Sequence, residues 1–143
     1  MALHTDPITA EVVTLIGRIV TRYNTEFDNV AAHHALTRVQ SRALLALEEP
    51  LSMRELATRL RSEPSNVTGI VDRLEARGLI ERRPDPADRR IKKIVTTEEG
   101  RTMNKDFKAS LDFAAHPLAT LDQGQRRQLR DLLRLMYADA EDV

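Results

Sequence analysis

The residues with the clearest chemical potential are six cations that lie close together in the middle of the 143-residue chain. They are Arg82, Arg83, Arg89, Arg90, Lys92 and Lys93. Guanidinium and ammonium groups at this density bind the phosphates of a nucleic-acid backbone. Charged residues also protect exposed strand edges from aggregation, but that purpose does not require six cations on two short segments. The cluster therefore favours binding to nucleic acid.

Two acids precede the last four of these cations in the stretch Asp-Pro-Ala-Asp-Arg-Arg-Ile-Lys-Lys, residues 85–93. Asp85 followed by Pro86 is typical of a turn. Asp88 is placed to hold and orient an arginine, because a carboxylate can accept hydrogen bonds from a guanidinium fork. We therefore interpret the acids as parts of the loop that presents the cations.

The net charge of the whole chain hides this basic segment, because 22 Lys and Arg residues balance 22 Asp and Glu residues. Residues 52–97 contain 11 cations and 7 anions, a net charge of +4, whereas residues 1–51 and 98–143 each have a net charge of −2. The charge distribution therefore predicts a nucleic-acid-binding region between two acidic flanks.

A second group of polar residues lies on a helix that we expect to begin at Pro64. Its apolar positions recur every three or four residues, so the other face is exposed. The apolar positions are Val67, Ile70, Val71 and Leu74, and the exposed ones are Ser65, Asn66, Thr68, Gly69, Asp72 and Arg73. Asn and Arg can bind purine edges, Ser and Thr can bind bases or phosphates, and glycine permits close approach. An ordinary solvated face is the alternative, although an exposed helical glycine costs roughly 1 kcal/mol.

The pattern of apolar residues predicts which elements position these side chains. A long amphipathic helix runs from Ile8 through Val30. Capping boxes at residues 37–40 and 52–55 begin short second and third helices, and Gly78 is expected to end the fourth. Segments 79–83 and 91–97 are expected to form a two-stranded hairpin whose register the sequence leaves open.

Two further helices complete the chain. One begins after Thr97 and is expected to be broken or bent by Pro117, and the last opens at Asp122. The predicted fold is mainly α with a small β-hairpin, in which the third and fourth helices and the hairpin form a winged helix-turn-helix.

Several classes of function are excluded or disfavoured. The chain has no cysteine, so disulfides, thiolate metal sites and cysteine nucleophiles are excluded. No GxSxG, Walker or dinucleotide-binding motif is present, so we expect no catalytic residue, no cofactor and no enzymatic activity. We find no membrane span or signal peptide and expect a cytoplasmic protein. Aromatic residues make up 3% of the chain, too few for a module that stacks single-stranded bases.

Histidines leave one metal hypothesis open. His33, His34 and His116 could serve a metal-responsive regulator, but adjacent histidines seldom point the same way on a helix and no HxxxH pair exists. We expect polar junction residues and no metal site.

Five stretches of the sequence resemble the MarR (multiple antibiotic resistance regulator) family of bacterial winged-helix transcription factors. They are Leu-Thr-Arg-Val-Gln (36–40), Glu-Leu-Ala (55–57), Val-Thr-Gly-Ile-Val-Asp-Arg-Leu-Glu-Ala-Arg-Gly-Leu-Ile (67–80), Asp-Pro-Ala-Asp-Arg-Arg (85–90) and Thr-Glu-Glu-Gly (97–100). The specific matches cover residues 36–100, and the flanks match in helical pattern only.

This resemblance implies roles for individual residues. Ser65, Asn66, Thr68 and Gly69 would belong to the recognition helix, and Arg73 would contact the DNA backbone. Asp88 and Arg90 would form the Asp-x-Arg of the wing tip, in which the arginine enters the minor groove. Arg89 would be an auxiliary contact. The full set of candidate DNA contacts is Thr37, Arg54, Ser65, Asn66, Thr68, Gly69, Arg73, Asp88, Arg89, Arg90 and Lys92.

The resemblance also implies how the chain is organised. Residues 1–143 would form one MarR-like unit, with a DNA-binding region at 36–100 and dimerisation helices at 1–35 and 101–143. A homodimer would bind a pseudo-palindromic double-stranded operator, as a repressor released by a small molecule such as a phenolic or other anionic aromatic effector. A winged-helix module that binds another protein is the alternative from a different class.

Overall fold

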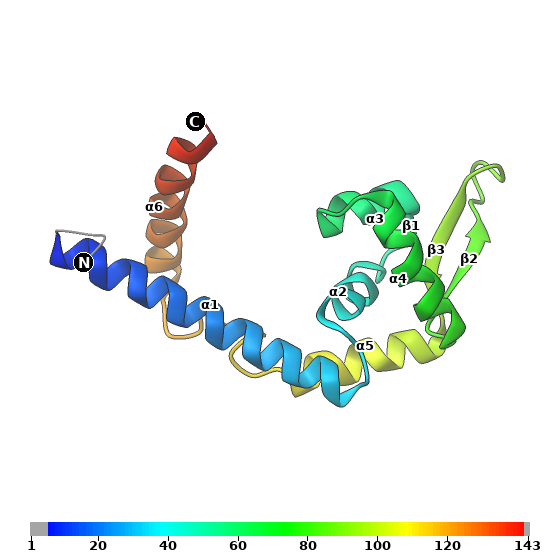
Figure 1. Cartoon of the computed structure of the whole chain (residues 1–143), viewed down its shortest axis with the longest axis horizontal. Coiled ribbons are helices and arrows are strands. Elements are labelled where there is room, and N and C mark those ends of the chain that lie inside the picture. Colours follow the sequence, from blue (N-terminus) through cyan, green and yellow to red (C-terminus); the bar gives the residue numbers. More distant parts are fainter. Residues whose placement is uncertain (1–5, 142–143) are drawn as a thin grey trace.

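The computed structural model describes residues 6–141, and the side chains of residues 6–138 (Figure 1). The helices are α1 (Pro7–His33), α2 (Arg38–Ala46), α3 (Met53–Leu60), α4 (Pro64–Ala76), α5 (Glu98–Ser110) and α6 (Gln123–Glu141). The strands are β1 (Leu51–Ser52), β2 (Ile80–Pro84) and β3 (Lys92–Thr96). The winged helix-turn-helix architecture predicted from the sequence is confirmed.

The long helix α1 connects two parts of the molecule. The lobe formed by α2, α3, α4 and the sheet lies at its C-terminal end, and α6 rises beside its N-terminal half (Figure 1). A single apolar core fills the lobe and reaches α1 and α5. Its fully buried side chains include Leu44, Leu47, Leu56, Val67, Val71, Leu74, Ile80, Ile94 and Phe107.

Local signals set the ends of the helices as expected. Thr37 and Ser52 each accept a hydrogen bond from an amide three residues on, and the side chains of Gln40 and Glu55 accept from the amides of the two caps. Both predicted capping boxes are therefore confirmed. Gly78 has φ +73°, the left-handed conformation expected after the end of α4.

The sheet has one strand more than the predicted hairpin. Residues 51–52 pair with β3 on the side away from β2, so the strand order is β1-β3-β2. Two residues are too few to show a periodicity in the sequence, and this strand is defined by its pairing with β3. The prediction of two strands was therefore incomplete.

The register that the sequence left open is defined by the pairs Arg82 with Ile94 and Arg83 with Lys93. Side chains directly opposite one another share a face, and successive residues alternate. Arg82 and Lys92 therefore lie on the face of buried Ile94, from which Arg82 reaches α4, whereas Arg83 and Lys93 lie on the other face.

Helix α5 ends earlier than the sequence indicated. It stops at Ser110, and Leu111 is extended, so Pro117 lies in the connection to α6 and does not break the helix. The carboxylate of Glu26 on α1 accepts hydrogen bonds from the amides of Asp112 and Ala114. This long-range anchor replaces the next helical hydrogen bonds, which explains why the chain leaves the helix before the proline.

Helix α5 packs very closely on the chain between α4 and β2. Thr97 donates from its amide to the carbonyl of Leu79 at 3.1 Å and from its hydroxyl to the carbonyl of Gly78 at 2.6 Å. A Cβ on Gly100 would lie 2.0 Å from the Leu79 oxygen. Only glycine permits this approach.

Among the described residues, no helix is both long enough and apolar enough to cross a membrane.

Replacing Gly100 with alanine should destabilise the fold by about 1–3 kcal/mol, because the added Cβ would collide with the carbonyl oxygen of Leu79. The backbone of Leu79 cannot move away without disturbing both β2 and α5. Urea unfolding at a fixed protein concentration measures this change. Gly69→Ala is the matched control, since a Cβ there meets nothing within 4 Å, and it should stabilise the protein by roughly 0.5–1 kcal/mol. Two glycine variants with equal stability would contradict the close approach.

Candidate nucleic-acid interface

The exposed face of α4 has the composition predicted from the sequence. Val67, Val71 and Leu74 are fully buried, and Ile70 is half-buried. The exposed residues are Ser65, Asn66, Thr68, Gly69, Asp72 and Arg73. A side chain at Gly69 would meet no other atom of the described molecule, so internal packing does not require glycine there.

The loop between β2 and β3 is organised by its two aspartates. The Asp85 carboxylate accepts from the amide of Ala87 at 3.0 Å, and the Asp88 carboxylate accepts from the amide of Arg90 at 3.1 Å. The Arg90 guanidinium is 3.9 Å from the Asp88 carboxylate, too far for a hydrogen bond, and its side chain is 96% exposed. Asp88 thus holds the backbone of Arg90 rather than its guanidinium.

Three of the six clustered cations are engaged within the protein. Arg82 donates to Asp72 at 2.7 Å and to Glu75 at 2.6 Å, both on α4, and these bonds raise the pKa of its guanidinium, the bond to Asp72 most. Lys93 donates to Glu55 in the first turn of α3. The sequence grouped Arg82 and Lys93 with the cations expected to bind phosphates. In the structure these two side chains join the hairpin to α4 and α3 instead.

Arg83, the third engaged cation, pairs with Glu81 on its own strand. Lys93 also lowers the pKa of Glu55 through its hydrogen bond. These three cations form ion pairs inside the protein, and the sequence alone could not distinguish them from the cations that remain unpaired.

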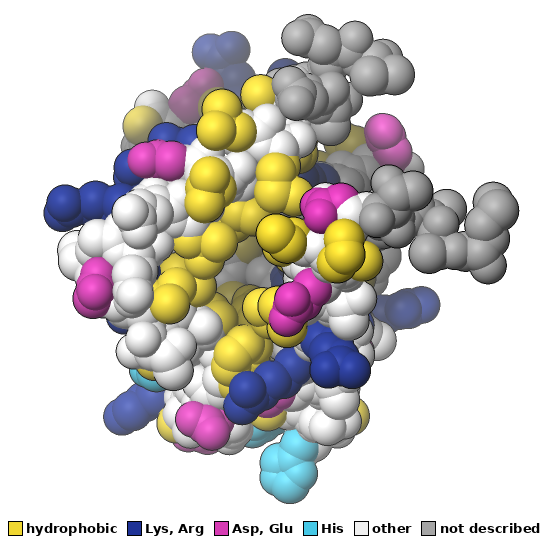
Figure 2. All heavy atoms as spheres, turned by 90° about the vertical axis from the view of Figure 1, so that its left-hand side faces the viewer, with side chains coloured by type: hydrophobic (Ala, Val, Ile, Leu, Met, Phe, Trp, Pro, Cys, Tyr) yellow, Lys and Arg dark blue, Asp and Glu magenta, His cyan; other side chains and the backbone are white. Residues whose placement is uncertain are grey.

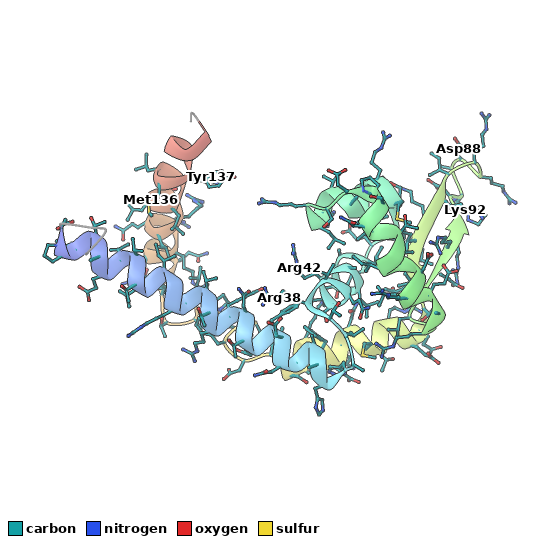
Figure 3. The ribbon with its side chains drawn as sticks, in the orientation of Figure 1. Arg38, Arg42, Asp88, Lys92, Met136 and Tyr137 are labelled. Carbon is teal, nitrogen blue, oxygen red and sulfur yellow. The ribbon has the colours of Figure 1, made fainter. Side chains whose placement is uncertain are left out.

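The other three clustered cations, Arg89, Arg90 and Lys92, make no ion pair shorter than 3.9 Å with any residue the structure describes, and neither do Arg54 on α3 and Arg73 on α4. We call these five cations and four exposed residues of α4 the basic surface: Arg54, Arg73, Arg89, Arg90, Lys92, Ser65, Asn66, Thr68 and Gly69. The hairpin tip projects beyond α4, with Asp88 and Lys92 near its end, on the side of the lobe away from α1 and α5 (Figures 1 and 3). Lys92 faces the α4 side of the hairpin, as the register requires.

Thr37 does not belong to this surface. It is the N-cap of α2, and its hydroxyl accepts from the amide of Gln40. The turn before Thr37 is held by Arg77, which follows the last residue of α4 and donates to the carbonyls of His34 and Ala35. Arg77 is about 18 Å from Ser65 along the axis of α4. The structure therefore gives Thr37 a capping role and does not bring it to the other candidates.

A small pocket of about 350 Å³ lies between α1 and α2, lined by Tyr23, Asn24, Phe27, Arg38 and Arg42. Arg38 makes a two-point ion pair with Asp28 on α1, at 2.7 and 2.5 Å, and this hydrogen bonding lowers the pKa of the Asp28 carboxyl. Arg42, one turn further along α2, has no such partner among the described residues. Figure 3 shows both arginines on the side of α2 that faces α1 and α6.

The two aromatic rings of this pocket connect it to the core. Tyr23 and Phe27 are stacked with their centroids 6.3 Å apart, and Phe27 meets Phe107 edge to face at 4.9 Å. The sequence pattern did not predict this pocket, although two arginines four residues apart on a short helix were a usable signal.

The histidines do not form a cluster. The rings of His33 and His34 are 5.8 Å apart and perpendicular, and within residues 6–141 no group of three or more His, Asp or Glu side chains could hold a metal ion. His34 instead packs against Phe107.

Apolar side chains lie exposed on α1 and α6, with exposures of 40% to 71%. They are Ile8, Val12, Val13, Leu15, Ile19, Val20, Leu132, Leu133, Leu135, Met136 and Tyr137. Figure 2 shows hydrophobic side chains gathered around a hollow on this side of the molecule. Leu133, Met136 and Tyr137 line a pocket of about 690 Å³ here, together with Ile16, Leu118, Leu129 and three arginines of α6. Ordinary surfaces of single chains rarely carry so large an apolar patch.

Comparisons with known proteins agree with this geometry. A family model described as MarR family matches residues 36–92. The chain is 30% identical over 139 residues to the HTH-type transcriptional repressor NicR of Pseudomonas putida, covering 95% of this chain and 88% of the relative.

Solved structures are similar over nearly the whole chain. CouR from Rhodococcus jostii, bound to p-coumaroyl-CoA, has a TM-score of 0.70 at 30% identity, with 94% of this chain and 95% of that chain covered. BpsR of Bordetella bronchiseptica, whose DNA binding is regulated by 6-hydroxynicotinic acid, has a TM-score of 0.67 at 25% identity, with coverage of 96% and 98%. The winged helix-turn-helix fold, the exposed polar face of α4 and these similarities together show that the chain belongs to the MarR family of DNA-binding transcription regulators.

Proposed function

We propose that the protein is a homodimeric repressor that binds a pseudo-palindromic DNA operator and is released by a small anionic aromatic effector. The observation that carries this proposal is the basic surface, on which unpaired cations of the wing tip lie beside the polar face of α4. The N-terminal half of a recognition helix enters the major groove in winged helices of this kind, and the wing reaches the neighbouring backbone or minor groove.

The division of charge on the lobe supports specific roles. Asn66 and Arg73 present groups that can bind base edges or phosphates, and Gly69 lets the DNA approach the helix. Arg90 extends from a loop whose backbone Asp88 holds, so that its guanidinium is presented with little loss of loop entropy on binding. Arg82, by contrast, keeps the hairpin at a fixed distance from α4 and supports the surface without touching DNA.

Dimerisation accounts for the apolar faces of α1 and α6. A second copy related by a two-fold axis would cover both faces and bring two recognition helices to one side of the assembly. Their separation would then correspond to about one turn of DNA, which requires a nearly palindromic site. The family relationship and the name of NicR as a repressor support the regulatory role.

The pocket between α1 and α2 is suited to an anionic aromatic ligand. Tyr23 and Phe27 offer ring surfaces, and Arg42 offers a guanidinium that no described carboxylate neutralises. The similarity to CouR and BpsR, which bind or respond to p-coumaroyl-CoA and 6-hydroxynicotinic acid, supports this class of effector. Because the pocket lies between the dimerisation helix and the lobe, a ligand that prefers one arrangement of the two would shift the dimer away from the DNA-binding geometry.

Replacing Arg90 with alanine should weaken binding to the operator by about 1–3 kcal/mol and make its salt dependence shallower, because one cationic contact is lost. Titration of DNA taken from upstream of the protein's own gene, at several salt concentrations, measures both effects. Lys105→Ala is the control, since it removes an exposed cation from α5, away from the basic surface. Equal affinities and slopes for the two variants would contradict the role of Arg90.

Replacing Leu133 with glutamate should convert the dimer to a monomer, because a carboxylate would be buried in the apolar interface without a partner. Sedimentation equilibrium should give twice the chain mass for the wild type and the chain mass for the variant. Ile91→Glu places the same charge on an exposed apolar residue of the wing and should leave the dimer intact. A monomeric wild type would exclude the proposed assembly.

Replacing Arg42 with alanine should lower the affinity for 6-hydroxynicotinate or p-coumarate by roughly tenfold or more, because a charge-assisted hydrogen bond is lost. Calorimetric titration of the wild type, Arg42→Ala and Lys105→Ala with both compounds and with benzoate measures this. Bound ligand should also release DNA from the wild type. If none of the three compounds binds, the proposed effector class is wrong.

A further inference from the structure

The turn between α3 and α4 contains an arginine in a backbone conformation that favours glycine. Arg61 has φ +50° and ψ +46°, in the left-handed region. The amide of Ser62 donates to the carbonyl of Ala57 at 3.0 Å, a hydrogen bond that fixes this conformation at the end of α3. An L-residue with a Cβ is strained here, and glycine would adopt the same backbone without that cost.

The side chain of Arg61 does nothing for the fold that would offset this strain. It is exposed, and no residue within the described part of the chain accepts a hydrogen bond from it or pairs with it. Among the described cations of α3, α4 and the hairpin tip, Arg54, Arg73, Arg89 and Lys92 likewise make no ion pair, and all of them belong to the basic surface. A strained residue without an internal role is best explained by a role outside the molecule.

The surroundings of Arg61 indicate what that role is. It lines a hollow of about 460 Å³ together with two members of the basic surface, Arg54 and Asn66. Thr58 and Ser62 also line this hollow, but their hydroxyls donate to the carbonyls of Arg54 and Leu60, and Glu63 is its single acid. The two guanidinium groups and the Asn66 amide are the donors that this hollow can offer to a phosphate oxygen.

We propose that Arg61 contacts a phosphate of the operator backbone and so extends the basic surface beyond the N-terminal end of α4. This inference rests on the proposed DNA-binding function and adds a residue and a type of contact to it. A contact to a phosphate carries no sequence information, so Arg61 strengthens binding to any duplex and fixes the position of the lobe, whereas α4 reads the bases. The protein thereby gives up some stability at this turn in exchange for affinity.

The test compares substitutions at Arg61 and Ala35 (φ +54°), the two non-glycine residues of left-handed conformation within residues 6–141. Arg61→Gly should raise Tm by roughly 1–4 °C, because the strain is relieved, and weaken DNA binding by about five- to twentyfold. The slope of log affinity against log salt should fall by about 1, and the loss should be the same on the operator and on a scrambled duplex. Ala35→Gly should also raise Tm but leave affinity and slope unchanged.

Arg61→Asn provides a second variant. Asparagine tolerates the left-handed conformation and is neutral, so it removes the charge without adding the flexibility of glycine. It should lose the same affinity as Arg61→Gly. Wild-type affinity and salt slope in both variants, with Arg90→Ala still impaired, would overturn the Arg61 contact alone. A wild-type protein that binds no duplex DNA would overturn the DNA-binding function and this contact together.

Discussion

The arrangement of the whole molecule depends on the close packing of α5 against the two residues that link α4 to β2. Thr97 donates to the carbonyls of both Gly78 and Leu79, and Gly100 allows the helix to approach the Leu79 oxygen directly. Four elements therefore meet at one point: the end of α4, the start of β2, the end of β3 and the start of α5. Because α5 leads to the connection held on α1 by Glu26, this junction sets the winged-helix lobe relative to the helices that carry the apolar faces.

A second link joins the same region to α1. Arg77, directly after α4, donates to the carbonyls of His34 and Ala35 at the end of α1. The pocket between α1 and α2 lies on the other side of this turn, with Arg38 joined to Asp28. Arg77 therefore joins the C-terminal end of α4 directly to the turn between α1 and α2.

The cations of the lobe are divided into two groups with different physical roles. Those near the base of the hairpin, such as Arg82 and Lys93, are held by carboxylates of α4 and α3 and fix the hairpin to the helices. Those at the tip and on the exposed helix faces have no such partners in the part of the chain that the structure describes. The division lets the surface be positively charged and still well defined, since the paired cations limit how far the wing can move.

Local interactions determined much of this fold, and the sequence alone was sufficient to predict them. The capping boxes at Thr37 and Ser52, the left-handed Gly78 and the polar face of α4 each involve residues within four positions of one another, so their pattern is visible in the chain. The family resemblance identified the DNA-binding class from the same stretches.

Tertiary structure decided the features that depend on residues far apart. The strand β1 forms only because β3 lies beside it, and α5 ends at Ser110 because Glu26 binds the following amides. Arg82 and Lys92 have the same charge and both lie on the hairpin, but only Arg82 is within reach of Asp72 and Glu75. Composition determines how many cations a segment carries, whereas the register and packing determine which of them remain available to DNA. Packing also decides the position of Thr37. The sequence placed it among the candidate DNA contacts, but in the structure it caps a helix far from the basic surface.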